Sequence, residues 1–581
     1  MRKPGSIPRS TSSERPRLIA CSWLCLVVVS SACADDRPAP PPPPATLARS
    51  RALPPGDVCP FGGTELAIGH DSNANGVLDD DEVEQRARSC ADARLIRLDP
   101  EPAGAHCPSG GRAVRTGLDR DHDGVLEDDE IESTTYACDP AAVFQGNFTA
   151  AMWSDPAAVA ALVGAEVVTG DLEIAGPDAT PLPRLMVVGG ALSVASTLGG
   201  PTTFEVPALT IVGGALDLAH QGLQGTIALP RLLRVGGGVR IAQPAVTALS
   251  APVLTDVRLL SIEGTGLEHL ALPALSETDL ALVLQDDPAL ADLSLPALRE
   301  LSELVVVHDA ALASLTGLDH VFRAASVTIA DNVALAEVEL PVLDSAGAMT
   351  ISGPAIEAVA LPRLVFARTL VVQDVPALEQ ITVPWLDTAY RIDVLAAPRL
   401  AQLELPLLRS LDGDPLSRTL IKGLAVSGTA LATLSLPALS TSVGRIAASG
   451  NPNLTTLDLP QLLRMDRLVI ANNPRLTTIS GPAVRTATGL DLQGSPLTTL
   501  ALGTLTSVTG DLRLVGAELT AVDGLGALQS ISGTLTLSGD PQLASLAGLA
   551  QLSSVRGAVA IDGCPALSPD DIAALIARVR H

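Results

Sequence analysis

The segment Leu468-Val-Ile-Ala-Asn-Asn473-Pro-Arg-Leu-Thr-Thr-Ile479 is one copy of a motif that recurs about every 22 residues through most of the chain. Each copy opens with an aliphatic-x-aliphatic run and then turns at a short polar residue. Repeats with a fixed period of about 20–50 residues predict a solenoid, because one unit buries its apolar face only when neighbours stack on both sides. Eighteen such runs start at Leu172, Leu192, Leu216, Val239, Leu260, Leu282, Leu304, Val327, Met349, Leu370, Ile392, Leu424, Ile446, Leu468, Leu490, Leu512, Leu535 and Val559.

The composition is consistent with a long, regularly stacked β-structure. Of 581 residues, 47% are hydrophobic but only 2% are aromatic, so Leu, Val, Ile and Ala fill the core. Small aliphatic side chains stack easily between strands about 4.8 Å apart, and 18 rungs at that spacing predict a rod of roughly 86 Å. The net charge of −26 argues against nucleic-acid binding, which needs patches of Lys and Arg.

The N-terminal segment predicts export. Five basic residues precede an apolar run over 18–32, which is long enough for a signal peptide but short for a membrane span. Ser30-Ser-Ala-Cys33 resembles a bacterial lipoprotein signal, which implies a signal peptide over 1–33, lipidation of Cys33 and a membrane anchor. The alternative is ordinary secretion, since Ala32-Cys33-Ala34 also fits a small-x-small cleavage site. Pro38 and Pro40 to Pro44 then predict an extended tether over 34–56.

Two copies of a small acidic cysteine module follow, at 57–91 and 105–139, offset by 48 residues. Each contains a twelve-residue loop that resembles an EF-hand calcium loop at every diagnostic position. The resemblance implies two structural Ca²⁺ ions, held by Asp71, Asn73, Asn75, Val77, Asp79 and Glu82 and by Asp119, Asp121, Asp123, Val125, Glu127 and Glu130. The alternative is a solvated acidic turn that binds no ion.

The EF-hand helices are missing from both modules. The residues between Cys59 and Asp71 include Gly62-Gly63, and Ser133-Thr-Thr-Tyr136 after the second loop predicts a strand. Four cysteines allow three pairings, but the duplication favours Cys59–Cys90 and Cys107–Cys138, one closing each module. We therefore expect disulfide-closed calcium loops, because so small a module needs such cross-links to fold.

The rungs turn at a repeated polar position, often followed by Pro. We expect these side chains to hydrogen-bond to backbone amides at buried corners. A Leu-x-Leu-Pro-x-Leu element marks a second face of each rung, since Pro fits at strand ends. The corner residues are Thr265, Asp287, Asp309, Asn332, Thr429, Asn451, Asn473, Ser495, Asp540 and Cys564.

The polar corners and the Leu-x-Leu-Pro-x-Leu elements resemble those of the receptor L-domain branch of leucine-rich repeats over 145–581. The resemblance implies a mostly β, right-handed solenoid with helical caps. Asp155-Pro156 predicts a helix start at one end, and 568–580 predicts a capping helix at the other, with Ile572, Leu575, Ile576 and Val579 on one face. One insertion, near 412–418, interrupts the period.

Three functions are compatible with this organisation. The first, which we favour, is a non-enzymatic, surface-anchored binding or adhesion protein with a calcium-stabilised stem and a protein or glycan ligand on the solenoid. The second is a structural envelope spacer without a ligand, which the low aromatic content supports. The third is a polysaccharide-cleaving enzyme using Asp287 and Asp309, although the same column continues through Asn and Thr, and no hydrolase, zinc or phosphate-loop motif is present.

Overall fold

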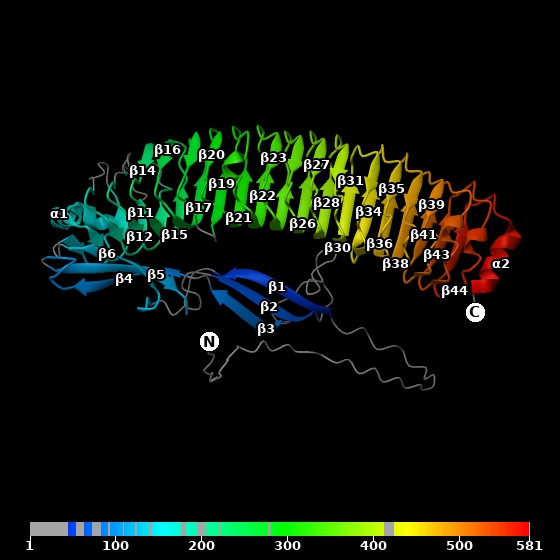
Figure 1. Cartoon of the computed structure of the whole chain (residues 1–581), viewed down its shortest axis with the longest axis horizontal. Coiled ribbons are helices and arrows are strands. Elements are labelled where there is room, and N and C mark those ends of the chain that lie inside the picture. Colours follow the sequence, from blue (N-terminus) through cyan, green and yellow to red (C-terminus); the bar gives the residue numbers. More distant parts are fainter. Residues whose placement is uncertain are drawn as a thin grey trace, which may run out of the picture.

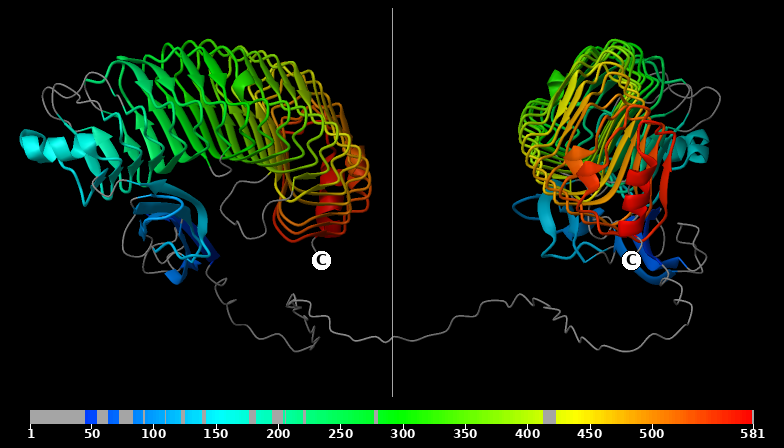
Figure 2. Two further views of the ribbon diagram at one scale, coloured as in Figure 1. Left: turned by 60° about the vertical axis from the view of Figure 1, so that its left-hand side comes forward. Right: turned by 90° about the vertical axis from the view of Figure 1, so that its right-hand side faces the viewer.

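The computed structural model shows a curved, mostly β rod with two small β-sheets below it (Figures 1 and 2). The structure describes residues 45–53, 63–71, 83–90, 93–108, 110–121, 125–138, 142–175, 182–194, 204, 206–219, 222–276, 280–411 and 423–579. The predicted signal peptide over 1–33 and Cys33 lie outside these residues, as does most of the tether. In the described part of the chain no helix is long and apolar enough to span a membrane.

The solenoid is built on one parallel sheet that runs along the whole rod. Its strands are β7 (Val143–Phe144), β8 (Val167–Val168), β9 (Leu172–Ile174), β10 (Val187–Val188), β11 (Leu192–Val194), β12 (Ile211–Val212), β13 (Leu216–Asp217), β15 (Arg234–Ile241), β17 (Asp256–Glu263), β19 (Ala281–Gln285), β21 (Glu300–Val307), β22 (Arg323–Ala330), β24 (Ser345–Ile351), β26 (Phe366–Gln373), β28 (Thr388–Leu395), β30 (Ser410–Leu411), β31 (Gly423–Ser427), β33 (Thr441–Ser442), β34 (Arg445–Ser449), β36 (Arg464–Ala471), β38 (Thr486–Gln493), β40 (Ser507–Val508), β41 (Leu512–Val515), β42 (Ser530–Ile531), β43 (Leu535–Ser538), β44 (Ser554–Val555) and β45 (Val559–Asp562).

Short strands form the second face of the rungs, where the Pro-containing element was expected. They are β14 (Gly225–Ala228), β16 (Val246–Ser250), β18 (His269–Ala271), β20 (Asp292–Ser294), β23 (Glu337–Glu339), β25 (Ala358–Ala360), β27 (Gln380–Thr382), β29 (Gln402–Glu404), β32 (Thr433–Ser435), β35 (Thr456–Asp458), β37 (Thr478–Ser480) and β39 (Thr499–Ala501). Four 3₁₀ turns also occur among the described residues: η2 (Ala150–Ser154), η3 (Thr316–Leu318), η4 (Asp523–Leu525) and η5 (Ala547–Leu549).

The eighteen predicted strand starts pair in one continuous register, from Leu172 opposite Leu192 to Leu535 opposite Val559. The mostly β solenoid fold is therefore confirmed. Ile392 pairs directly with Leu424, so the insertion between them does not shift the register. The insertion itself falls in 412–422, outside the described residues. All of these strand starts except Val559 are buried, and they join one hydrophobic core along the rod.

The polar corner residues form hydrogen bonds between successive rungs. Asp287 Oδ1 accepts hydrogen bonds from Thr265 N at 2.7 Å and Thr265 Oγ1 at 2.6 Å, and Asp309 Oδ1 accepts one from Asp287 N at 2.9 Å. Where the corner residue is Asn, its amide also donates to a strand carbonyl, as Asn332 Nδ2 does to Val306 O at 2.9 Å. These side chains satisfy backbone groups that water does not reach, as the sequence predicts.

Helices cover both ends of the solenoid, at the positions predicted from the sequence. Helix α1 (Pro156–Gly164) starts after Asp155, whose carboxylate accepts a hydrogen bond from Ala157 N at 2.9 Å. Helix α2 (Pro569–Val579) buries Leu575 and Val579 against the last rungs. Because an open end would expose strand edges and core, these helices cap the rod.

Each cysteine module is a three-stranded antiparallel sheet. The first contains β1 (Ala45–Leu53), β2 (Gly63–Asp71) and β3 (Val83–Cys90), and the second contains β4 (Ala93–Glu101), β5 (Gly111–Asp119) and β6 (Ile131–Ala137). The two sheets share register at an offset of 48 residues, since Ala45 pairs with Asp71 as Ala93 pairs with Asp119. Strands β1 and β4 precede the segments 57–91 and 105–139 that the cysteines delimit.

Candidate metal centre in the second cysteine module

The second acidic loop joins two strands rather than two helices. Strand β5 ends at Asp119 and β6 begins at Ile131, which leaves the loop between them. Cys107 and Cys138 form the expected disulfide, with an S–S distance of 2.08 Å and a Cα–Cα distance of 4.9 Å. Gly117 lies where the strands resume pairing after a bulge, and a Cβ there would stand 1.9 Å from Glu130 O. The sheet therefore needs glycine at this position to bring the loop ends together.

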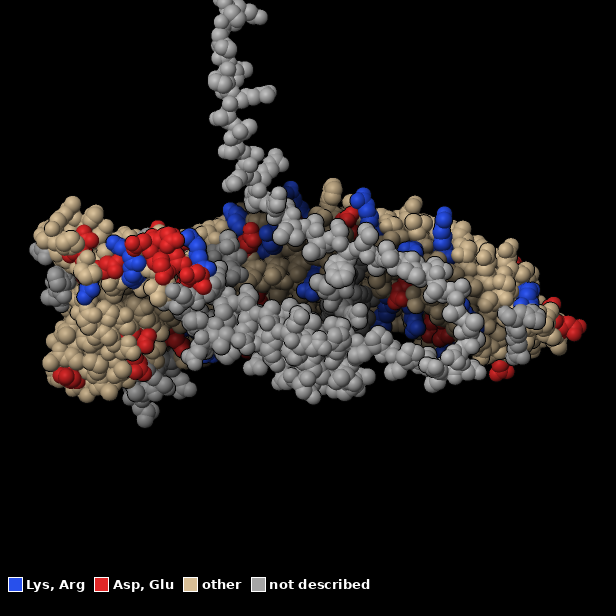
Figure 3. Space-filling view, turned by 90° about the horizontal axis from the view of Figure 1, so that it is seen from below, with Lys and Arg blue, Asp and Glu red and all other residues tan. Residues whose placement is uncertain are grey.

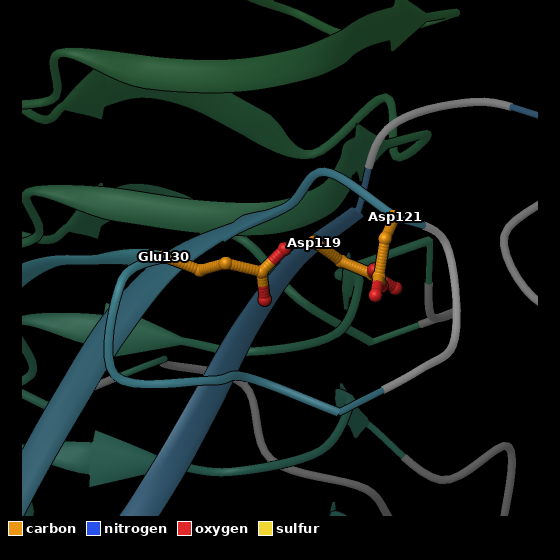
Figure 4. A group of neighbouring side chains, drawn as sticks. All are labelled: Asp119, Asp121 and Glu130. Carbon is orange, nitrogen blue, oxygen red and sulfur yellow. The ribbon is translucent and has the colours of Figure 1, made fainter.

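Three of the expected ligands converge in the loop. One carboxylate oxygen each from Asp119, Asp121 and Glu130 lies within 4.8 Å of the others, and Figure 4 shows the side chains gathered across the loop. Asp119 and Glu130 are 1% and 5% exposed, whereas Asp121 is open to solvent. Three carboxylates this close repel one another unless a cation lies between them.

Backbone amides orient the Glu130 carboxylate. Its Oε1 accepts a hydrogen bond from Arg120 N at 2.6 Å, and its Oε2 accepts one from Glu127 N at 3.2 Å. The hydrogen bond from the Arg120 amide, followed by that from Glu127, holds the pKa of Glu130 below its ordinary value. The side chain is thus ionised at neutral pH and fixed in direction, as a metal ligand requires.

The donor set fits a hard divalent cation. All three converging groups offer oxygen, which Ca²⁺ and Mg²⁺ prefer, and the described residues add no thiolate or imidazole to the group. Val125 is exposed and Glu127 is half-buried in the same loop, while Asp123 falls within 122–124, outside the described residues. A Ca²⁺ ion here would be held by Asp119, Asp121 and Glu130, and it would neutralise their charge and lock the loop.

The first loop has one described member. Asp71 ends β2, at the position that Asp119 occupies in β5. The other expected ligands of this loop lie in 72–82, outside the described residues: Asn73, Asn75, Val77, Asp79 and Glu82. Cys59 of the expected Cys59–Cys90 bridge lies in 54–62, which is also outside them.

Arg97, which the sequence analysis did not single out, holds the second loop against its sheet. Its guanidinium donates to Leu126 O at 2.6 Å and pairs with Asp99 at 2.9 Å and with Asp128. Arg115, the cross-strand partner of Arg97, reaches the same two carboxylates. The hydrogen bond from Arg97 lowers the pKa of Asp128. A cross-strand Arg pair beside an acidic loop is the sequence signal that identifies this clamp.

The module packs directly on the solenoid. Val114 and Ala137 form a small apolar cluster with Val167, Val187 and Ile211 of the first rungs. At its edge Arg234 lies 3.8 Å from Glu132 and 3.6 Å from Asp256. Seen from below, acidic side chains gather at the end of the molecule where the module lies, with basic side chains beside them (Figure 3). The loop is thus held close to the start of the rod.

A known protein family matches the two cysteine modules. A family model described as a domain of unknown function, DUF7151, matches residues 46–90 and 94–138. The two matches repeat the 48-residue offset of the duplication, and each begins with the strand before the first cysteine. No curated protein matches the chain.

Proposed function

We propose that the chain is a non-enzymatic binding or adhesion protein of the bacterial cell surface, whose cysteine modules form a calcium-stabilised stem. The observation that carries the proposal is the convergence of Asp119, Asp121 and Glu130 in a module that packs on the solenoid. Calcium at this position would rigidify the joint between stem and rod, and the stacked rungs offer a broad surface to a ligand. The loops, which resemble EF-hand loops, are the proposed sites for two Ca²⁺ ions.

The anchor and the kind of repeat belong to the same proposal. The lipoprotein-like Cys33 would tether the chain to a membrane, with free secretion as the alternative. The polar corner residues and the Leu-x-Leu-Pro-x-Leu motifs resemble those of receptor L-domains, and this resemblance fits a rod that presents a binding face. Asp287 and Asp309 are fully buried and bonded to backbone amides, which favours a structural role over catalysis. A ligand-free envelope spacer is the competing function, since aromatic residues are scarce.

Calcium titration by calorimetry on the exported protein tests the stem. We expect two sites in the wild type and none in the Glu82→Gln plus Glu130→Gln double variant. Glu130→Gln alone should remove one site. The matched control is Asp129→Asn, an exposed neighbour in the same loop that lies outside the ligand positions, and it should retain both sites. An absence of calcium heat from the wild type would leave the loops as acidic turns and refute the proposed stem.

A further inference from the structure

Aromatic side chains lie on two parts of the solenoid. One group packs on the core at the first rungs, where Phe148 contacts both Phe144 and Trp153. The other lies on the rungs of β22 to β28 and consists of Phe322, Phe366, Trp385 and Tyr390. Trp385 is 59% exposed, and Phe366 packs edge-to-face on Tyr390 with ring centroids 5.5 Å apart. Exposed indole rings are costly to hydrate and are enriched at binding sites, so the exposure of Trp385 points to a ligand.

A pocket of about 480 Å³ lies at this place, within the size range of ligand sites. It is built from two columns of side chains on successive rungs. One column consists of residues just before the main-sheet strands, and the other of residues that each follow a proline. The lining side chains are Phe322, Asp344 and Val365 in the first column and Val342, Arg363 and Trp385 in the second.

The first column is held rigidly by backbone hydrogen bonds. Asp344 N donates to Phe322 O at 2.8 Å, and Val365 N donates to Asp344 O at 2.8 Å. The ladder continues to the next rung, where Asp387 N donates to Val365 O at 2.9 Å. The backbone of this column is therefore fixed at the strand spacing of about 4.8 Å before any ligand arrives, which lowers the entropic cost of binding.

The pocket presents one acidic and one basic group to a ligand. Among the described residues, no side-chain hydrogen bond or ion pair engages the Asp344 carboxylate or the Arg363 guanidinium. The neighbouring rung differs, since Asp387 is paired with Arg409 at 3.1 Å. An acceptor and a donor thus line the pocket on the two rungs that precede Trp385.

We propose that this pocket binds a neutral saccharide, an assignment that rests on the proposed binding function and names its ligand class. A sugar ring offers an apolar C–H face to Trp385 and Val365, and its hydroxyls both donate to Asp344 and accept from Arg363. A purely apolar partner would desolvate those two charges without pairing them, and a polyanion would meet the Asp344 carboxylate. A saccharide satisfies both the apolar and the charged part of the lining.

Calorimetry with the full exported chain and three probes tests the site: the neutral hexasaccharides of glucose, xylose and N-acetylglucosamine. We expect saturable binding of at least one probe, with the affinity reduced at least tenfold by Trp385→Ala and several-fold by Arg363→Ala. Val333→Ala is the matched control, because Val333 is 58% exposed but lies outside the pocket, and its affinity should equal that of the wild type. Thermal melts of all variants establish that they are folded.

The other outcomes each overturn the assignment in a distinct way. Binding that Trp385→Ala and Arg363→Ala leave unchanged would place the sugar elsewhere on the solenoid and refute the pocket while leaving a binding function intact. If none of the three hexasaccharides bound, the proposal that the ligand is a neutral saccharide would be refuted. Binding of a peptide with the sequence of residues 38–44, without any sugar, would reassign the pocket to the chain's own proline-rich segment. Calcium titration remains a separate readout, so failure of the stem and failure of the pocket are distinguishable.

Discussion

At the scale of single residues, the corner column contains carboxylates where its chemistry favours amides. Asp309 is fully buried, and its Oδ1 accepts the Asp287 amide hydrogen while its Oδ2 has no hydrogen-bond partner. Burial raises the pKa of Asp309 to about 7, and the carboxylates of Asp287 and Asp286 add to this effect. The hydrogen bond from the Asp287 amide, and to a lesser extent His308, act in the opposite direction. The pKa values of Asp287 and Asp540 are also raised, mainly by burial.

The contribution of these buried carboxylates to stability should therefore fall as the pH rises. An unfolded Asp ionises near pH 3.9, so between about pH 4 and pH 7 the folded state holds the extra proton and the free energy of unfolding decreases by up to about 4 kcal/mol. Asp309→Asn should remove this contribution and raise the melting temperature at pH 8, because its amide can donate as Asn332 does to Val306 O. Melts of both proteins at pH 5 and pH 8 measure the difference.

The reverse exchange supplies the control. Asn332→Asp places a third carboxylate in the same run of corners and should steepen the loss of stability between pH 5 and pH 8. If Asp309→Asn retained the pH dependence of the wild type, the buried carboxylate of Asp309 would not be its source.

The repeated polar residues predicted the column of corner side chains. Which carboxylate oxygens in that column lack a hydrogen-bond partner depends on contacts between neighbouring rungs, and only the structure shows these contacts.

At the scale of elements, the strand before each first cysteine proves as important as the loop. The motif directed attention to the segment between Cys107 and Cys138, so β4 and Arg97 were missed, although Arg49 occupies the equivalent register in β1. The aliphatic repeat determined the solenoid register because every rung obeys the same alternation. The clamp and the packing of the second module involve contacts between distant segments, which local patterns do not encode.

Arg97→Ala should weaken calcium binding to the second loop by about five- to tenfold, a loss of roughly 1 kcal/mol, since Leu126 O and Asp128 would no longer be held. The calcium affinity of Arg97→Lys should lie between those of the wild type and Arg97→Ala, because Lys keeps the positive charge but lacks the planar guanidinium that reaches several acceptors. Calorimetry of the full chain measures the calcium affinity of both variants, and Arg112→Ala on β5 is the control. Unchanged affinity in Arg97→Ala would show that the loop holds its shape without the clamp.

At the scale of the whole molecule, a small apolar contact joins the second cysteine module to the rod. Ile96 of β4 lies against Gly213, where an added Cβ would stand 3.0 Å from Ile96 Cδ1. Ile96 also packs on the cluster that joins Val114 to Val187 and Ile211. Because repeats contact only their neighbours, disturbance at this joint should stay within the first rungs rather than spread along the rod.

Ile96→Asp should therefore detach the second module, because it places an unpaired charge in an apolar contact, at a cost of about 1–3 kcal/mol. Hydrogen exchange should become faster in β8, β10 and β12 and remain at wild-type rates from β31 to β45. Val333→Asp, on an exposed corner, should change neither region. Faster exchange along the entire solenoid would mean that Ile96 supports the fold as a whole, and unchanged exchange in β8, β10 and β12 would mean that the joint rests on Arg234 and its carboxylate partners instead.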